Sequence, residues 1–509
     1  MTWRKNDPQG NEAAKVKWDL IPYTTGRGLD LGCGQFKTFE HFTGVDNGHH
    51  WGNKGVDVMV ETCEKLDIFA DSSFDFVFSS HLLEHIVNTE ATLKEWMRVI
   101  KNDGYLILYL PHKDFYPNVG QDGANPDHKH DFVPDDIIRF MKKCGSWDLI
   151  ENEERNEGYE YSFFQVYQKG GKGRRYSYQA PKPEKTCAVV RYGAFGDALQ
   201  TSSIFAGLKK QGYHVTFYTV NQGYQVVKND QNVDKFVVQF NDQIPNHDLG
   251  KFWNHLKTKY TKVVNLSESV EKTLLAMPGT MAHEWPQSMR RKHLDKNYLE
   301  FMHDIAEVPY EPLQRFYATN DEIAWALAEK KKLGGKVILY SLSGSAVHKT
   351  WPWLDQFIAR LMLHDKALKI ILVGDSTCQL LEAGWEKEPR VIRKSGVWTI
   401  RESIAFAQVA DMVIGSETGV LNAVGFDTVP KIVTMSHSSV ENLTRDWINC
   451  TSLVPNNTPC YPCHQLHYSF EFCTRDEATG VSACQADITI DQMWQAFKDW
   501  SKNWQLLAA

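Results

Sequence analysis

Short, continuous apolar runs recur along almost the whole chain, and each is followed by an amphipathic stretch. The runs lie at 28–31, 44–46, 74–79, 105–110, 187–191, 215–218, 262–266, 337–342, 369–373, 412–414 and 431–434. Runs of this kind are typical of parallel strands that helices bury on both faces. The pattern therefore predicts α/β domains built on parallel sheets, whose ligands bind at the carboxyl ends of the strands.

Two breaks in this pattern divide the chain into domains. The segment 170–185 is rich in Gly, Pro and basic residues, which is typical of a flexible or extended linker. A second break follows the helical pattern at 321–332, where a Gly-Gly pair precedes a new apolar run. Since 509 residues suggest about three domains, we expect them at 1–169, 186–330 and 331–509.

Charge is spread unevenly over these parts. Residues 1–170 carry 18 Lys/Arg against 28 Asp/Glu, whereas 171–185 carry five basic residues against one acidic. An acidic first domain is a poor binder of nucleic acid, because neutralising phosphates needs clustered basic side chains. The sequence has no apolar run of 18 residues and no signal-like N-terminus, so we expect a cytoplasmic chain without a membrane span.

The first domain has a glycine-bearing turn after its first apolar run, in the sequence LDLGCG. Gly32 and Gly34 permit a tight turn and the close approach of a ligand to the backbone. Asp46 ends the next run, where a carboxylate can accept hydrogen bonds from ribose hydroxyls. The third element, FDFVFSSHLLEHI, is a buried strand that leads directly into a helix.

With these motifs in this order, residues 18–168 resemble the class I S-adenosylmethionine-dependent methyltransferases. GYLILYLPH and HKHDFVPDDIIRFMKKCG fit the same family. The resemblance implies that Gly32 and Gly34 approach the methionine part of the cofactor, that Asp30 helps to fix its ammonium group and that Asp46 holds its ribose. It places the adenine contacts near residues 63–66.

Methyl transfer to a hydroxyl or amine needs alignment and a base. His81 directly follows the third of these strands and is the first candidate for the base; His112, His128 and His130 are alternatives. A histidine satisfied structurally is the competing explanation for each. His81 and His85, four residues apart, have the spacing of a metal-binding pair, but no third ligand is evident and the family needs no metal.

The second part of the chain contains three further strand–turn–helix motifs: RYGAFGDALQTSSI, SLSGSAVHKTWP and GSETGVLNAVG. Helix starts and a lysine suit the binding of phosphate. Together the motifs resemble glycosyltransferase family 9, the heptosyltransferase-like enzymes, over residues 186–500. That resemblance implies a GT-B fold with an acceptor domain at 186–330 and a nucleotide-sugar domain at 331–509, so that three Rossmann-like, doubly wound domains are expected in all.

The family 9 resemblance also implies roles for individual residues. Asp197 is the base of an inverting displacement, although an acid in the first turn of a helix can also be purely structural. The donor diphosphate is held by Ser345, Lys349, Glu417, Thr418, Gly419 and Asn422. Glu417 and Asn422 depart from the family's usual Asp and His, which puts the sugar and the nucleotide in doubt. No Asp-x-Asp motif is evident, so metal-independent transfer is expected.

The segment 450–484 holds five of the ten cysteines. Cys460, Cys463, Cys473 and Cys484 have a spacing compatible with tetrahedral, structural zinc. A disulfide and free packed thiols are the alternatives.

The leading hypothesis is a bifunctional enzyme that uses S-adenosylmethionine and a nucleotide-diphosphate sugar to methylate and glycosylate small-molecule or glycan acceptors. A nucleic-acid modifier that glycosylates hydroxylated bases is an alternative, favoured by the basic linker and opposed by the acidic first domain. A scaffold with one inactive domain is a third. The sequence does not specify the oligomeric state.

Overall fold

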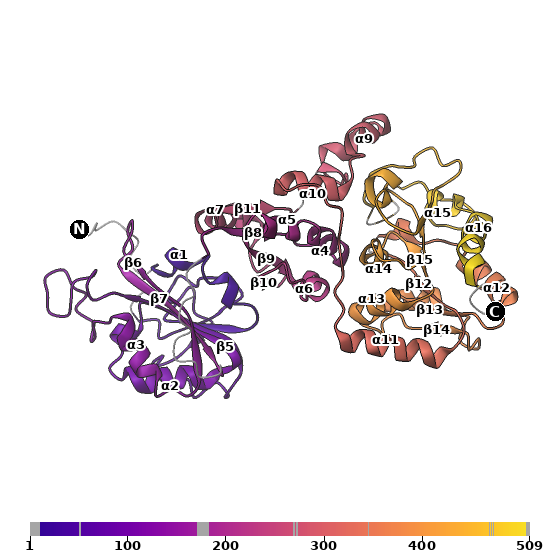
Figure 1. The fold of residues 1–509 in the computed structure, drawn as a ribbon. Coiled ribbons are helices and arrows are strands. Elements are labelled where there is room, and N and C mark those ends of the chain that lie inside the picture. Colours follow the sequence, from indigo (N-terminus) through magenta and orange to yellow (C-terminus); the bar gives the residue numbers. More distant parts are fainter. Residues whose placement is uncertain are drawn as a thin grey trace. The chain divides into compact units, whose positions relative to one another are not determined.

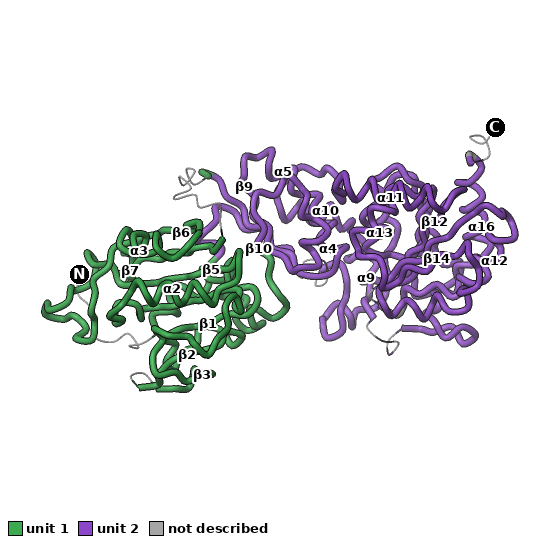
Figure 2. Tube along the Cα trace, turned by 90° about the horizontal axis from the view of Figure 1, so that it is seen from below, with its two compact units in different colours: residues 1–184, 238–255 green, residues 185–237, 256–509 purple. Residues whose placement is uncertain are grey.

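The structure is a computed structural model that describes residues 11–49, 52–170, 183–267, 270, 273–344, 346–467, 469, 471 and 473–504. It divides into two compact units, Met1–Glu184 with Val238–His255 and Lys185–Val237 with Leu256–Ala509 (Figure 2). Most of the expected linker, residues 171–182, lies outside the described residues. Among the residues described, no helix has the length and apolar character needed to cross a membrane.

The first unit is built on one seven-stranded sheet with the order β3-β2-β1-β4-β5-β7-β6 (Figure 1). Its strands are β1 (Gly28–Leu31), β2 (Thr43–Asp46), β3 (Val58–Met59), β4 (Phe74–Ser80), β5 (Ile100–Pro111), β6 (Trp147–Arg155) and β7 (Ser162–Lys169). Its helices are α1 (Ala13–Val16), η1 (Ile21–Tyr23), η2 (Leu83–His85), α2 (Thr89–Val99) and α3 (Pro134–Met141). The central strand β1 pairs in parallel with β2 and β4, so their carboxyl ends meet at one edge.

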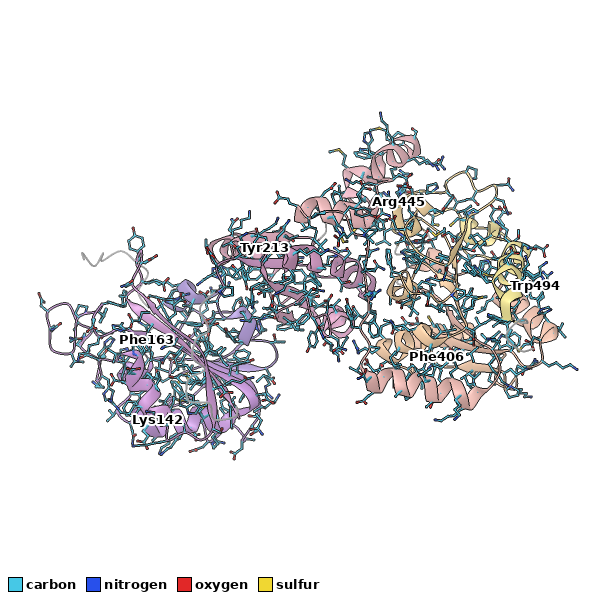
Figure 3. The ribbon with its side chains drawn as sticks, viewed as in Figure 1. Lys142, Phe163, Tyr213, Phe406, Arg445 and Trp494 are labelled. Carbon is cyan, nitrogen blue, oxygen red and sulfur yellow. The ribbon has the colours of Figure 1, made fainter. Side chains whose placement is uncertain are left out.

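The four apolar runs predicted in this unit are its strands β1, β2, β4 and β5. Three of these strands are buried along most of their length, because helices such as α2 and α3 pack apolar side chains against the sheet. Figure 3 shows Phe163 of β7 within this core. Strands β6 and β7 were not predicted; they run antiparallel to each other, and β6 alternates buried and exposed residues without a continuous apolar run.

Residues Val238–His255 belong to the first unit although they follow β8 and β9 in the chain. The Gln243 side-chain amide donates to the Ile21 carbonyl at 3.2 Å, and the Thr25 hydroxyl donates to the Val238 carbonyl at 2.7 Å. The ring centroids of Trp18 and Phe252 lie 6.0 Å apart. These contacts fasten the segment to the start of the chain.

The second unit contains two further sheets with the orders β10-β9-β8-β11 and β14-β13-β12-β15-β16-β17. The four-stranded sheet contains β8 (Thr186–Val190), β9 (His214–Val220), β10 (Lys235–Gln239) and β11 (Lys262–Asn265). The six-stranded sheet contains β12 (Val337–Ser341), β13 (Lys369–Val373), β14 (Val391–Arg393), β15 (Met412–Ser416), β16 (Lys431–Thr434) and β17 (Cys450–Leu453). Every strand pairing recorded in these two sheets is parallel.

Helices cover both of these sheets. They are α4 (Phe195–Ser202), α5 (Phe205–Lys210), α6 (Asn221–Val227), α7 (Leu249–Lys259), α9 (Gln287–Leu294), α10 (Tyr298–Ala306), α11 (Asn320–Leu333), α12 (Leu354–His364), α13 (Ile400–Val409), α14 (Gly419–Val424), α15 (Ala483–Asp487) and α16 (Ile490–Ser501). Shorter turns are η4 (Met281–Glu284), η5 (Val347–Lys349), η6 (Ser376–Glu382), η7 (Val440–Thr444) and η8 (Lys502–Trp504). The turn η3 (Asn246–Asp248) and the first part of α7 lie in the segment Val238–His255 of the first unit. The predicted fold class, α/β with three sheets dominated by parallel strands, is confirmed.

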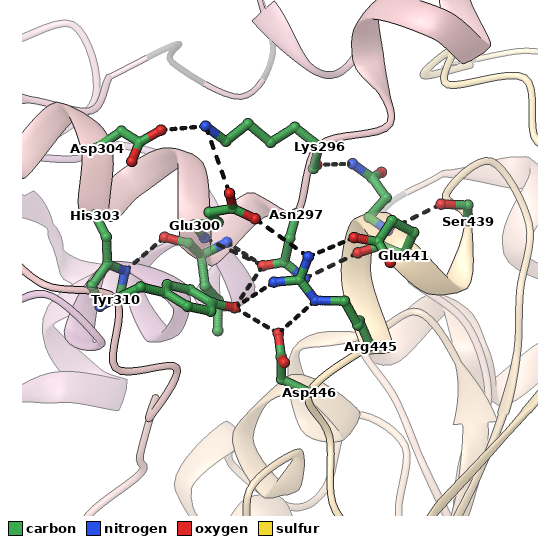
Figure 4. Close-up of polar contacts among 12 residues, drawn as sticks. Lys296, Asn297, Glu300, His303, Asp304, Tyr310, Ser439, Glu441, Arg445 and Asp446 are labelled. Atoms are coloured by element: carbon green, nitrogen blue, oxygen red, sulfur yellow. Dashed lines mark hydrogen bonds and ion pairs between the residues drawn. The ribbon is translucent and has the colours of Figure 1, made fainter.

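The two sheets of the second unit share one apolar core, which includes Phe205 of α5 and Phe406 of α13. A network of polar side chains also connects segments of the second unit (Figure 4). The Arg445 guanidinium donates to the Tyr310 hydroxyl at 3.0 Å and to the Glu300 carboxylate at 3.3 Å. The Asn297 side chain donates to the Glu441 carbonyl at 3.1 Å. The segment 296–310 is therefore held against η7 and the residues that follow it.

Replacing Arg401 by alanine is expected to destabilise the second unit by about 2 kcal/mol, because its guanidinium makes charge-assisted and main-chain hydrogen bonds in a mostly buried position. It contacts the Glu322 carboxylate at 2.6 Å and the Gln225 carbonyl at 2.6 Å. Hydrogen bonding to Arg401 is the largest cause that lowers the pKa of Glu322 from 4.5 to about 2. This stabilisation is therefore complete above about pH 4.5 and is lost as the pH falls through 2.

Chemical denaturation at neutral pH measures this effect. Arg393→Ala is the matched control, since the Arg393–Glu386 ion pair at 3.2 Å is largely exposed and contributes little. Equal stabilities of the two variants would contradict the prediction.

Candidate functional site

A glycine-bearing turn at the carboxyl end of β1 forms the first candidate site. Gly32 has φ +74° and Gly34 has φ +51°, which are left-handed conformations that favour glycine. A Cβ at Gly32 would lie 3.0 Å from the Leu82 side chain. Glycine is therefore required at position 32 both by the backbone conformation and by the nearby Leu82 side chain.

Two carboxylates support this turn in different ways. Asp46 accepts a hydrogen bond from the Gly34 amide at 3.0 Å and another from the Gly48 amide at 2.7 Å. Asp30 is almost fully buried and accepts from the Thr38 amide at 2.8 Å. Burial is the largest cause that raises the pKa of Asp30 to about 6, and the hydrogen bonds of Thr38 oppose it.

These residues fit the cofactor that the sequence implies. The glycine turn at the carboxyl end of β1 suits the methionine part, and Asp46, only partly buried at the edge of the sheet, suits ribose hydroxyls. Cys63 and Leu66, from the segment expected near the adenine, are both buried in the core of the unit. Asp30 lies at the buried base of the turn, where it holds the Thr38 amide.

His81 follows β4 and has φ +48°, an uncommon conformation for a residue other than glycine. Its Nε2 lies 2.9 Å from the Ser162 hydroxyl, and its Nδ1 lies 3.9 Å from a Glu84 carboxylate oxygen. Burial, reinforced by Lys15 and the neighbouring histidines, lowers its pKa well below the ordinary value. His81 is thus a neutral imidazole held in a fixed orientation.

The three alternative bases lie close to this region. The His112 ring stacks on Phe115 with centroids 4.2 Å apart, and its Nδ1 accepts from the Asp114 amide at 3.1 Å. His130 Nε2 lies 3.2 Å from the Val87 carbonyl. His112 and His130 line one small cavity together with His128.

His128 also belongs to a cluster that the sequence did not reveal. Glu84, His85 and His128 each offer a ligand atom, and the three atoms lie within 4.8 Å of one another. The sequence signal was the motif HLLEH, whose glutamate was not considered as a ligand. No other group of three potential metal ligands meets this distance limit among the residues that the structure describes.

Asp197 lies in the first turn of α4 in the second unit. One carboxylate oxygen pairs with the buried Arg191 guanidinium at 2.8 Å, and the other accepts from the Ala194 amide at 2.8 Å. The start of α4 lies against the start of α14, since a Cβ at Gly419 would be 3.2 Å from the Phe195 Cβ. The carboxylate is therefore fixed where two helix starts from different sheets meet.

Lys349 and Glu417 lie in the same region. The Lys349 ammonium donates to the Glu417 carbonyl at 3.0 Å. Burial is the largest cause that lowers the pKa of Lys349, and the charges of Glu417 and Asp197 oppose it. Burial alone would raise the pKa of Glu417, but His437, at 2.8 Å, and Lys349 outweigh it, and the pKa falls to about 2.

The remaining predicted donor-binding residues have varied surroundings. The Thr418 hydroxyl caps α14 and lies 2.9 Å from the Ser341 hydroxyl. Asn422 accepts from the Gln200 side chain of α4 at 3.4 Å, so it contributes to the contact between the two sheets. Ser345 lies outside the described residues.

The four predicted zinc ligands, Cys460, Cys463, Cys473 and Cys484, line one cavity of about 40 Å³ together with three histidines. Burial raises the pKa of the Cys463 thiol to about 12 and that of Cys473 to about 11. Sulfur atoms on one zinc ion are about 3.8 Å apart, given Zn–S bonds of about 2.3 Å, whereas no three of the cavity's ligand atoms lie within 4.8 Å of one another. In this arrangement the four thiols do not form a preorganised site for one zinc ion.

Comparisons with known proteins identify the class of domain in the first unit. Residues 29–108 match the family model of the methyltransferase domain, which confirms the resemblance seen in the sequence. The chain is also 26% identical over 160 residues to the uncharacterized protein MJ1123 of Methanocaldococcus jannaschii, a match that covers 26% of this chain and 77% of that protein. This chain is a transferase that carries a methyltransferase domain.

Solved structures similar to parts of the chain include a heptosyltransferase and a methyltransferase. The ADP-heptose lps heptosyltransferase II of E. coli is 10% identical, with a TM-score of 0.45, and the match covers 63% of this chain and 99% of that one. An S-adenosylmethionine-dependent methyltransferase of Thermotoga maritima, described as a possible histamine N-methyltransferase, is 19% identical, with a TM-score of 0.26, over 31% of this chain and 89% of that one.

Proposed function

We propose that this chain is a bifunctional enzyme that methylates and glycosylates acceptors of one glycan or glycoconjugate pathway. The first unit transfers a methyl group to a sugar hydroxyl, and the second transfers a sugar, with inversion, from a nucleotide-diphosphate donor. The observation that carries the proposal is that each unit has its own glycine-bearing turn with a fixed carboxylate beside it, Asp46 in one and Asp197 in the other.

In the first unit, Gly32, Gly34 and Asp46 would hold S-adenosylmethionine, which when bound supplies an electrophilic methyl group. His81 is proposed as the base for the acceptor hydroxyl, since Ser162 fixes its ring in one orientation. A neutral imidazole can accept the proton that the hydroxyl loses as its oxygen takes the methyl group. Burial lowers the pKa of His81, so it is a weaker base than an exposed histidine.

In the second unit, Asp197 is proposed to accept the proton of the acceptor hydroxyl as that oxygen attacks the anomeric carbon. Arg191 and the Ala194 amide fix the direction of its carboxylate. The bond to the diphosphate breaks in the same step, and Lys349 with the start of α14 at Thr418 and Gly419 stabilises the charge that develops there. The transfer needs no metal ion on this account.

Lys349→Met is expected to weaken the binding of a nucleotide-diphosphate sugar by about 10- to 100-fold, because one charge-assisted contact to phosphate is lost. Gly344→Ala should have the same effect, since a Cβ at Gly344 would lie 2.8 Å from the Lys349 Cδ and would displace the side chain. Calorimetric titration with the donor measures this. Lys387→Met, at an exposed lysine on the loop that precedes β14 of the same sheet, is the control. An unchanged affinity in both test variants would rule out the role of Lys349.

The binding of a structural zinc ion by the four cysteines of the segment 450–484 remains a prediction. No step of either proposed reaction depends on this ion. It is tested by the metal content of the purified protein. Cys463→Ser and Cys484→Ser should each lose one equivalent of zinc per chain, and an unchanged zinc content in both would refute the prediction.

The function itself is tested by incubating the full chain with labelled S-adenosylmethionine, a panel of nucleotide sugars and a saccharide library. The proposal expects methyl label and transferred sugar on saccharide products. Methyl label only on nucleic acid or on protein would contradict it. Ligands that bind the folded chain will also raise its melting temperature, which identifies the donor before an acceptor is known.

A further inference from the structure

The cluster of Glu84, His85 and His128 lies in the first unit, beyond the carboxyl end of β4. Glu84 and His85 belong to the turn η2, whereas His128 comes from a loop more than forty positions later in the chain. A Glu84 carboxylate oxygen lies 3.8 Å from His128 Nε2 and 3.9 Å from His85 Nε2. The ring centroids of His85 and His128 are 4.7 Å apart and nearly perpendicular.

Glu84 is a buried carboxyl group without a hydrogen-bond partner. Its side chain is fully buried, and neither carboxylate oxygen has a hydrogen-bond partner from another residue. Buried carboxylates are normally paired, hydrogen-bonded or bound to a metal ion. Burial is the largest cause that raises the pKa of Glu84 to about 8, and Glu12 adds to this effect.

The main chain holds the two parts of the cluster together. The Glu84 carbonyl accepts hydrogen bonds from the Lys129 amide at 2.8 Å and the His130 amide at 3.2 Å. The loop that carries His128 is thus fastened to the residue whose carboxylate it faces. Tyr116 packs beside the His128 ring with centroids 5.4 Å apart. The ligand atoms are therefore arranged before any ion binds.

The kinds of ligand atom that the three side chains offer determine which ions the site can bind. Two imidazoles and one carboxylate bind Zn²⁺ and other divalent transition metals, with bonds of about 2.0–2.2 Å. Ligand atoms on one tetrahedral ion of this kind are about 3.4 Å apart. The spacing of 3.8–3.9 Å around the Glu84 oxygen exceeds this by about 0.4–0.5 Å, a difference that small side-chain movements close. We infer that Glu84, His85 and His128 bind a divalent transition-metal ion, with Zn²⁺ as the natural candidate.

Such a site keeps coordination positions open, because three protein ligands do not fill the shell of the ion. His128 also lines the small cavity formed with Tyr116, His112 and Asp131. An oxygen of the methyl acceptor would take the open position, and the ion would lower the pKa of that hydroxyl. This role rests on the proposed methyl transfer, whereas binding of the ion does not.

The site is tested by titrating the chelator-treated, full-length protein with Co²⁺ alone and recording its absorption spectrum. Ligation by nitrogen and oxygen gives weak visible bands without the intense ultraviolet bands of thiolate ligation, so the cysteine cavity is distinguished. Glu84→Gln, which keeps the size of the side chain, and His85→Ala should each weaken the binding of this equivalent by at least about 100-fold. His247→Ala, at a highly exposed histidine of the same unit, is the control.

Melting temperatures measured in chelator show whether the variants fold. Folded Glu84→Gln and His85→Ala proteins that bind Co²⁺ like the wild type would overturn the inference, as would a spectrum that changes only in Cys463→Ser. If methyl transfer occurs, chelation should lower it and Zn²⁺ should restore it, with glycosyl transfer unchanged. If Co²⁺ binds as expected but no saccharide is methylated, the metal site stands and the proposed function fails.

Discussion

Asp197→Asn is expected to lower glycosyl transfer by about 10²- to 10⁴-fold, the usual contribution of a general base. Asparagine keeps the size of the side chain but cannot take the proton of the acceptor hydroxyl. The turnover number should therefore fall, while the affinity for the nucleotide sugar changes little. Binding of S-adenosylmethionine to the first unit should be unaffected.

The competing explanation is that Asp197 only caps α4, where it accepts from the Ala194 amide at 2.8 Å. Asp321→Asn is the matched control, because Asp321 is an exposed acid in the first turn of α11. Both variants lose a favourable charge at a helix start, at a cost of about 0.3–1 kcal/mol. Only Asp197→Asn should lose turnover. Retained transfer in a folded Asp197→Asn protein would disprove the assignment of the base.

Asp46→Ala is expected to weaken the binding of S-adenosylmethionine by about 100-fold, because two charge-assisted hydrogen bonds of about 1.5 kcal/mol each are lost. Its carboxylate oxygens brace the Gly34 and Gly48 amides at 3.0 and 2.7 Å. The variant therefore loses both the ribose acceptor and the shape of the turn. Calorimetric titration with the cofactor measures the effect.

Asp57→Ala separates these two contributions. Asp57 lies next to the same turn and accepts from the Gly44 amide at 2.8 Å and from Lys37 at 3.0 Å, but it is not a predicted ribose ligand. A cofactor affinity near that of the wild type is expected for this variant. Equal losses in Asp46→Ala and Asp57→Ala would show that Asp46 only supports the loop.

Much of the fold could be predicted because buried parallel strands are short, continuous apolar runs. Lys369–Val373 and Lys431–Thr434 match β13 and β16 residue for residue. The runs did not include β3, β6, β7, β10, β14 and β17. β6 is partly exposed, and β3 and β14 have only two and three residues, so none of these three forms a long continuous apolar run. The attachment of Val238–His255 to the first unit depends on contacts with residues 18–25, which no local pattern reveals.

The same distinction applies to the residues of the candidate sites: some could be predicted from the sequence and others could not. Gly32, Gly34 and Asp46 could be found because a turn and its acid lie at fixed places beside two strands. Glu84 could not, because what sets it apart is its burial without a hydrogen-bond partner, together with the approach of His128 from a distant loop. Asn422 likewise depends on tertiary structure, since it contacts Gln200 of the other sheet.

The central claim is that one chain carries two separate active centres. It is tested most directly by measuring the by-product of each reaction, S-adenosylhomocysteine for methyl transfer and the nucleoside diphosphate for glycosyl transfer. The wild type, Asp46→Ala and Asp197→Asn are compared with the same saccharide acceptors. The account predicts that Asp46→Ala loses only methyl transfer and that Asp197→Asn loses only glycosyl transfer. Loss of both activities in either folded variant, or of neither in both, would contradict it.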